Sequence, residues 1–373
     1  MKKIFVCLCL FFGMIIQIPV YGNDEELDTE SLQSIETVLE EQQVDISYTE
    51  IVKQLMTGNV KNVLKILWKK LSNQMFSAFF INRKFLKQII IAALVAAVFK
   101  NLSDAFFQGS AGNTSFYVTY VILIGFMADS FYFLNQAAQN LVNLMIDYMK
   151  GMVTAYSIAV VSTSGISTST AVYEFYLMVI FGMSLITNSV VLPMIKILFI
   201  LRIVNHISEE EHFSRLCHTL EWVVRIILKG FLSIILGVQL IQSMILPAVD
   251  SLKNTTIQKG ISAIPGIGNG MNSVMTTILG SAVVIKNSIG AAGILVLVVL
   301  VVPPLLQISG VVLSYIGAGI LLQPISDKRV TGAMDAVILS GKLMLGMIMT
   351  ITMLFVLSIA IIAFSTNANY YAG

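Results

Sequence analysis

Long runs of apolar residues constrain this sequence more than any other feature. A transmembrane helix needs about 20 predominantly apolar residues, and several stretches approach or exceed that length. Charged residues make up only 12% of the chain, against about 25% in a soluble domain. The sequence therefore predicts an all-α polytopic membrane protein with about seven spans. The predicted spans are residues 88–107, 116–134, 135–161, 171–204, 223–249, 291–324 and 336–365.

Residues 264–290 depart from the pattern of a plain spanning helix. The stretch is apolar enough to enter a bilayer, yet it opens with PGIGNG and carries Lys286 and Asn287 near its far end. Glycine and proline weaken helices, and a lysine in hydrocarbon costs on the order of 2.5–3.5 kcal/mol. Irregular backbone at membrane depth needs a covering of protein or a wet cavity. We therefore expect an irregular element here, packed inside the protein, with ordinary helices around it.

Two of the apolar runs are too long for one straight span. Residues 171–204 contain one proline, and residues 291–324 contain Pro303 and Pro304. Proline removes a backbone donor and kinks or breaks the interior of a helix. These runs are predicted to be broken or re-entrant helices. Residues 162–170, STSGISTST, are predicted to form a small polar loop between spans.

The first 86 residues carry the charge that most of the chain lacks. Residues 1–22 combine Lys2 and Lys3 with an apolar core and a small-residue end, which is typical of a secretory signal peptide. An uncleaved first helix is the alternative. Residues 23–86 are acidic first and then basic, and the signal peptide predicts that they lie outside the cytoplasm. The polytopic membrane domain is then residues 87–373.

A basic amphipathic helix is predicted within that hydrophilic region, at residues 60–71. It places valine and leucine on one face and Lys61, Lys65 and Lys69 on another. Such a helix suits the surface of an anionic bilayer. Basic residues beside the first span otherwise favour the cytoplasm, but an interfacial helix explains them without a change of side. A helix that packs on the protein is the alternative.

Two segments, residues 151–250 and 261–362, follow the same order of features. Each has a small-residue stretch, a proline within an apolar run, a polar connector and a terminal span. The connectors, residues 208–215 and 326–329, both carry basic residues, so the positive-inside rule predicts that both face the cytoplasm. We therefore predict an internal repeat whose two copies cross the membrane in the same direction, as in some transporters.

Charged residues within or beside the apolar runs are the strongest functional candidates. Intramembrane ionisable side chains usually face the bundle interior and pair with one another. The alternative is that they reach the headgroups from the ends of spans. The polar neighbour Asn287 favours an inward position for Lys286, and Glu174 is its candidate partner from the other repeat. Both positions stay open for Lys196, Asp335 and Lys342.

Motifs for bond-making chemistry are weak in this sequence. PGIGNG lacks the GK[ST] ending of a phosphate loop, whereas Gly266 and Gly270 have the GxxxG spacing that lets helices pack closely. No catalytic, cofactor or metal-ligating set has motif spacing, and Cys217 is the one cysteine beyond the leader. The net charge of +2 gives no reason to expect a nucleic acid as partner.

These features together resemble the stage III sporulation protein AE family. The most specific parts are AIPGIGNGMN…GSAVVIKNSIG at residues 263–290 and LLQPISD…MDAV at residues 321–337. The signal peptide, the acidic-then-basic region and the double proline add to the resemblance, which covers essentially the whole chain. It implies a multi-pass subunit of the channel complex between the mother cell and the forespore of endospore-forming bacteria. Sister proteins of the same operon and a forespore protein are the implied partners, beside the lipid bilayer.

The resemblance also implies a location in the mother-cell membrane that surrounds the forespore, and no enzymatic activity, catalytic residue or cofactor. A stand-alone secondary transporter is the main alternative, because repeats, broken helices and intramembrane charges are typical of transporters. An intramembrane enzyme is the weakest, because no nucleophile and base are motif-spaced. Homo-oligomerisation is left open.

Overall fold

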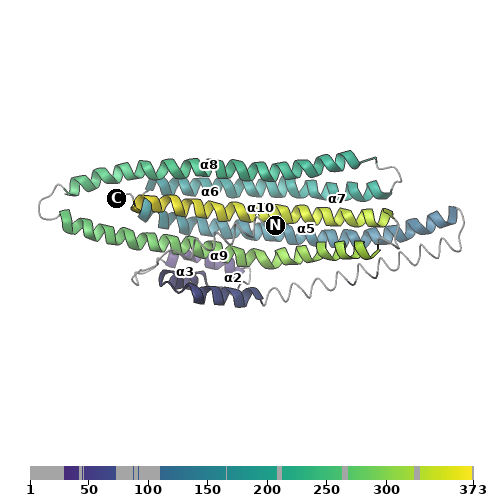
Figure 1. The fold of residues 1–373 in the computed structure, drawn as a ribbon, viewed down its shortest axis with the longest axis horizontal. Coiled ribbons are helices and arrows are strands. Elements are labelled where there is room, and N and C mark those ends of the chain that lie inside the picture. The colour runs from purple at the N-terminus through teal and green to yellow at the C-terminus, as the bar shows by residue number, and fades with distance from the viewer. Residues whose placement is uncertain are drawn as a thin grey trace.

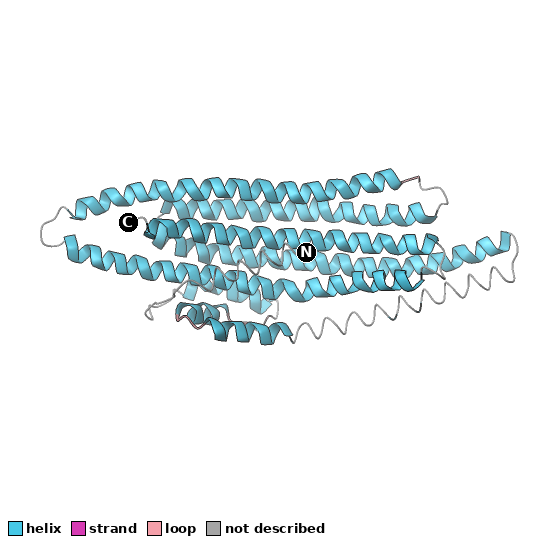
Figure 2. Ribbon diagram, in the orientation of Figure 1, coloured by secondary structure: helices cyan, strands magenta, loops and turns pink. Residues whose placement is uncertain are grey.

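The computed structural model is almost entirely helical in its described part, which contains no strand (Figure 2). It describes residues 29–41, 44, 46–72, 87, 91, 110–164, 166–207, 212–262, 268–322 and 328–371. The helices are α2 (Thr29–Glu41), α3 (Tyr48–Met56), α5 (Ser110–Ser164), α6 (Ile166–Leu185), the π-helix η1 (Ile186–Val191), α7 (Leu192–Ile207), α8 (Ser214–Ser262), α9 (Gly268–Leu322) and α10 (Lys328–Tyr371).

The long helices α5 to α10 lie side by side in an antiparallel bundle (Figure 1). The helices α6, η1 and α7 follow one another without a break and together form one rod of the bundle. The helix ends that flank the α7–α8 connector and those that flank the α9–α10 connector lie at the same end of the bundle (Figure 1). This is the arrangement expected of two copies that run in one direction, although a true internal repeat stays a prediction.

Five helices are long and apolar enough to cross a membrane within the described residues. The all-α polytopic membrane fold is therefore confirmed, whereas the predicted span 88–107 lies outside the described residues. With 55 residues at about 1.5 Å each, α9 is about 80 Å long, more than twice the roughly 30 Å hydrocarbon core of a bilayer. The longest helices must therefore extend beyond the membrane. The five candidate spans are Tyr120–Ser164, Ile166–His206, Ser214–Ile245, Gly280–Leu321 and Val330–Ala363.

The predicted irregular element at residues 264–290 is wrong for most of its length. Helix α9 begins at Gly268 and continues through Lys286 without interruption, and Pro303 and Pro304 also lie inside it. Packing explains the difference, because nearly every side chain from Lys286 to Val301 is buried against neighbouring helices. A helix also satisfies its own backbone polar groups, which an irregular segment in an apolar surrounding does not.

Two further predictions about span boundaries are wrong. The predicted spans 116–134 and 135–161 are parts of the single helix α5, and every described residue of the predicted loop 162–170 is helical. The run 171–204 is continuous rather than broken into two helices. Its departure from α-helical geometry is confined to the π-helical turn η1. Small polar residues are tolerated in these helices because tertiary contacts outweigh their weak propensities.

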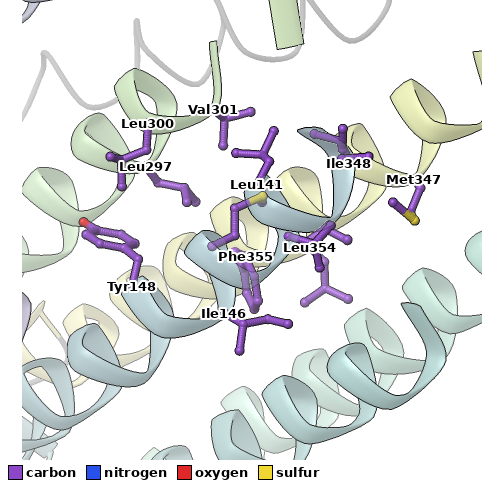
Figure 3. Packing of buried hydrophobic residues seen from close by; sticks show 14 of the residues in the cluster. Leu141, Ile146, Tyr148, Leu297, Leu300, Val301, Met347, Ile348, Leu354 and Phe355 are labelled. Atoms are coloured by element: carbon purple, nitrogen blue, oxygen red, sulfur yellow. The ribbon is translucent and has the colours of Figure 1, made fainter. Parts of the chain in front are cut away.

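The helices α5, α9 and α10 form the centre of the bundle and pack on one another along most of their length. Tyr148 and Phe355 are fully buried between them, and aliphatic side chains from all three helices fill the space around (Figure 3). The labelled residues of this core are Leu141, Ile146 and Tyr148 of α5, Leu297, Leu300 and Val301 of α9, and Met347, Ile348, Leu354 and Phe355 of α10.

The hydrophilic N-terminal region contributes two amphipathic helices that pack on one flank of this bundle (Figure 1). Helix α2 packs on α5, and its fully buried residues are Leu32, Ile35 and Leu39. Helix α3 packs on α9, and its N-cap residue Ser47 accepts a hydrogen bond from the Glu50 backbone N–H at 3.2 Å. This cap explains why a helix starts here, because it satisfies one of the donors that a helix leaves unpaired at its N-terminus.

The predicted amphipathic helix at residues 60–71 is present as residues 60–72. Its apolar face is turned to the protein, because Val63 and Leu67 are buried in the same core as α2 and α3. Lys61, Lys65 and Lys69 are exposed. The structure therefore favours packing on the protein over the insertion of this apolar face into a bilayer.

Candidate functional site

A run of polar side chains is buried in the middle of α9. Lys286 is 0% exposed, Asn287 9% and Ser288 2%, although the surrounding residues of the helix are apolar. The sequence analysis expected Lys286 to face inward, and the structure confirms this position. Buried charges in proteins are costly and are usually retained for a specific interaction.

Three tyrosines surround the part of α9 that follows Lys286. The Tyr48 hydroxyl of α3 donates to the Ile289 carbonyl at 2.6 Å, and the Tyr148 hydroxyl of α5 donates to the Gly293 carbonyl at 3.0 Å. The ring of Tyr156 lies against Gly290, where an added Cβ would come within 3.1 Å of the ring. We call these buried residues the Lys286 cluster: Tyr48, Tyr148, Tyr156, Lys286, Asn287 and Ser288.

Glycine at position 290 lets three helices meet beside Lys286. Lys286 and Gly290 are one helical turn apart, so they lie on the same face of α9. An added Cβ at Gly290 would meet Tyr156 of α5 on one side and Ile359 of α10, at 3.6 Å, on the other. The adjacent Ser358 carbonyl accepts a hydrogen bond from the buried Gln239 amide of α8 at 2.7 Å. The helices α3, α5, α8, α9 and α10 therefore converge at one level along the bundle.

Helix α6 joins this level through its contact with α5. The buried Ser169 hydroxyl donates to the Ser157 carbonyl at 2.6 Å, directly beside Tyr156. The buried hydroxyls of Tyr156, Ser157 and Tyr176 have no hydrogen-bond partner among the described residues. Unsatisfied buried hydroxyls are uncommon, and they cluster here around the one fully buried lysine of the described chain.

Electrostatics keep the phenol of Tyr48 in its neutral form. Burial raises the pKa of Tyr48 well above its ordinary value, and Tyr156 and Glu36 add smaller effects in the same direction. The hydroxyl therefore stays protonated and continues to donate to Ile289 throughout the physiological pH range. Glu36 itself fixes the start of α3, because its carboxylate accepts from the Ser47 hydroxyl at 3.0 Å and from the Thr49 N–H at 2.9 Å.

The other charged candidates do not join the Lys286 cluster. Glu174 is exposed on α6, on the same side as the exposed Tyr173 and Leu177, so the predicted pairing with Lys286 is wrong. The register of α6 decides this, because it turns Val172 and Tyr176 inward and Glu174 outward. Lys196 of α7 is exposed, as are Asp335 and Lys342 of α10, which agrees with the alternative that these side chains reach water or headgroups.

The candidate packing residues are spread along α9. Gly266 lies outside the described residues, and Gly270 lies in the first turn of the helix. Pro303 is buried and Pro304 half-buried within the helix interior, more than three turns beyond the Lys286 cluster. The structure thus does not bring Gly270 or the proline pair into contact with Lys286.

The tyrosines are the part of this site that sequence reasoning missed. Tyr48 lies in the hydrophilic N-terminal region, more than 200 residues from its partner Ile289, so no local pattern connects them. One signal was available for α3, since Ser47 and Glu50 have the S-x-x-E spacing of a helix N-terminus. The described residues contain no group of three or more His, Cys, Asp or Glu side chains placed to hold a metal ion.

The arrangement is suited to hold polar contacts between helices inside an apolar bundle, because it offers an amine, an amide and several hydroxyls. Comparison with known proteins finds one family and one curated protein that are similar to this chain. The profile of one family, described as stage III sporulation protein AE, matches residues 46–366. A protein of Bacillus subtilis (strain 168) described as stage III sporulation protein AE is 23% identical over 302 residues, which cover 80% of this chain and 75% of that relative. No solved structure matches the chain.

Proposed function

The chain belongs to the stage III sporulation protein AE family, and from this premise we propose that it is a membrane subunit of the mother-cell-to-forespore channel complex. The family assignment establishes a role in sporulation and agrees with the five helices long enough to cross a membrane. The observation that carries the proposal is the extent of the match, because residues 46–366 include α3, α5 to α9 and the whole Lys286 cluster.

In this proposal the chain lies in the mother-cell membrane that surrounds the forespore, and its partners are the other subunits of the complex. The signal peptide at residues 1–22 brings the N-terminal helices to the non-cytoplasmic side of the bundle. The ends of the bundle at the α7–α8 and α9–α10 connectors then face the cytoplasm. The chain binds and assembles rather than catalyses a reaction.

Deletion of the gene in the native host tests this function. Cells that lack the protein should complete engulfment and then fail in forespore development, and expression of the full chain in trans should restore it. Co-purification of the full chain with the operon's other membrane proteins from sporulating cells is the second readout. Normal spore yield after deletion, with no such association, contradicts the proposal.

A secondary transporter is the second candidate, favoured by the buried amine and hydroxyls of the Lys286 cluster at the level where several helices converge. The same deletion strain separates the two functions. A stand-alone transporter should change the uptake of a solute in growing cells and should need no sister subunit for its activity. A channel subunit should show a defect in sporulating cells alone.

A further inference from the structure

The two flanks of the bundle differ in polarity at one level. The level is fixed by a chain of contacts from Tyr48 of α3 to Ile289 of α9, from Gly290 to Ile359 of α10, and from Ser358 to Gln239 of α8. Helix α8 forms one edge of the bundle, and α2 and α3 lie on the opposite side together with the helix at residues 60–72 (Figure 1). The surfaces around Gln239 and around Tyr48 therefore lie at the same height on opposite flanks.

Around Gln239 the surface of α8 is apolar. No charged residue occurs from Phe231 to Ile245, and this segment exposes only aliphatic side chains at its large positions. Met244 is 78% exposed and Ile241 62%. In water this surface would be a large exposed apolar patch, whereas in a bilayer the acyl chains would cover it. The exposed large residues of this segment are Ile234, Val238, Leu240, Ile241, Met244 and Ile245.

The charged side chains of α8 lie nearer its N-terminus, among exposed apolar residues that include Leu216, Trp222 and Ile226. The first part of the helix, Ser214 onward, carries a series of exposed charges, and the neighbouring helices expose Lys196, Asp335 and Lys342 in the same half of the bundle. Charged side chains are rare on lipid-facing surfaces. On α6, the exposed Glu174 lies among apolar side chains. We therefore assign the lipid-facing flank from the surface of α8 alone. The exposed charged residues of α8 are Arg215, Arg225 and Lys229.

On the opposite flank, α2 and α3 present charge at this same level. Their apolar faces are fully used against α5 and α9, so their outer faces are polar. Asp147 and Lys150 of α5 lie beside Gly151, where α2 docks, and add to this surface. Several carboxylates and amines in contact with acyl chains would be strongly unfavourable. The exposed polar residues of α2 and α3 include Gln33, Glu40, Glu41, Glu50 and Lys53.

We infer that the flank formed by α2 and α3 borders an aqueous space at the depth of the bilayer, while α8 on the opposite flank contacts lipid. A subunit with one wet and one lipid-facing flank at the same depth is built to line a pore or a water-filled crevice. The Tyr48 hydroxyl then lies between that water and the Lys286 cluster. The inference does not rest on the sporulation role, since it follows from the surface of the bundle alone.

Site-directed spin labelling of the full chain in lipid nanodiscs tests this arrangement. Single cysteines replace Gln33 and Lys53 on one flank and Ile241 and Met244 on the other, in a chain whose natural cysteines have been replaced. Collision rates with oxygen, which concentrates among acyl chains, are compared with those of a water-soluble nickel chelate. The fully buried Leu39 position serves as the control and should collide weakly with both.

The expected result is a reversal of the collision ratio between the two flanks. Labels at Ile241 and Met244 should favour oxygen and respond to lipids that carry a mid-chain spin label, whereas labels at Gln33 and Lys53 should favour the nickel chelate. Oxygen preference at Gln33 and Lys53 overturns the inference, because that flank then contacts lipid. Weak collisions with both reagents at Gln33 and Lys53 also overturn it, because a second copy then covers the flank. Nickel preference at Ile241 overturns the assigned depth.

Discussion

The docking of α2 on α5 depends on the absence of a side chain at Gly151. An added Cβ there would lie 3.0 Å from the Ser34 carbonyl oxygen, 3.3 Å from its carbon and 3.4 Å from Ile35 Cα. All three atoms belong to the backbone of α2, so no side-chain rotation can relieve the contact. The Ser34 hydroxyl also donates to the Gly151 carbonyl at 3.2 Å. Gly151→Leu should therefore push α2 away from the bundle.

The free-energy cost of Gly151→Leu is the sum of two contributions. Overpacking of a close contact costs about 1–3 kcal/mol. Loss of the hydrogen bond from Ser34 adds about 0.5–1.5 kcal/mol. Together they shift the docking equilibrium by about 1.5–4.5 kcal/mol, which is roughly a 10- to 2000-fold increase in the undocked fraction. Gly151→Ala should have a much smaller effect, because the higher helix propensity of alanine, about 1 kcal/mol, offsets part of the clash.

Cysteine reactivity measures the undocked fraction directly. Leu39→Cys places a thiol at a site that is 0% exposed when α2 is docked, so its labelling rate reports undocking. Gly125→Leu is the matched control, since Gly125 lies on the same helix with nothing within 4 Å of an added Cβ. The labelling rate should rise in the Gly151→Leu chain and stay unchanged in the Gly125→Leu chain. Equal rates in the two chains would refute the packing of α2 on α5.

Three further predictions concern the bundle itself. Tyr48→Phe removes the hydrogen bond to the Ile289 carbonyl and should destabilise the docked state of α3 by about 0.5–1.5 kcal/mol, measured by the same labelling assay with Val52→Cys, a fully buried position of α3. Lys286→Met and Lys286→Arg should both lower spore yield, because the site is fully buried and a guanidinium is larger than an ammonium, whereas Lys342→Met at an exposed position should be neutral. Gly341→Ala places a Cβ against Val312 Cγ2 and should lower the free energy of unfolding of the purified protein by about 1–3 kcal/mol, and Val312→Ala in the same chain should restore part of it.

The sequence alone determined the class of the protein and the direction of one important side chain. Long apolar runs and few charges can only be satisfied by helices in a bilayer, so the all-α membrane fold followed from composition. Asn287 beside Lys286 indicated an inward lysine, because two adjacent polar residues stand within an otherwise apolar run, and both side chains are buried. The position of the α7–α8 and α9–α10 connectors at the same end of the bundle could also be predicted, from the order of the apolar runs and the charges between them.

Only the tertiary structure decided where the chain is irregular and what surrounds Lys286. Glycine and proline lower helix propensity by a few kcal/mol at most, and the packing of α9 against α5 and α10 outweighs that penalty, so the helix continues from Gly268 through Pro303 and the predicted break at the proline pair is absent. The pairing of Lys286 with Glu174 failed because Glu174 lies two residues, about 200° around the helix, from the inward-facing Val172 and Tyr176 of α6. Tyr48 reaches Ile289 across 241 positions of sequence, and such a contact exists only because docking of α2 and α3 buries their apolar faces on the bundle.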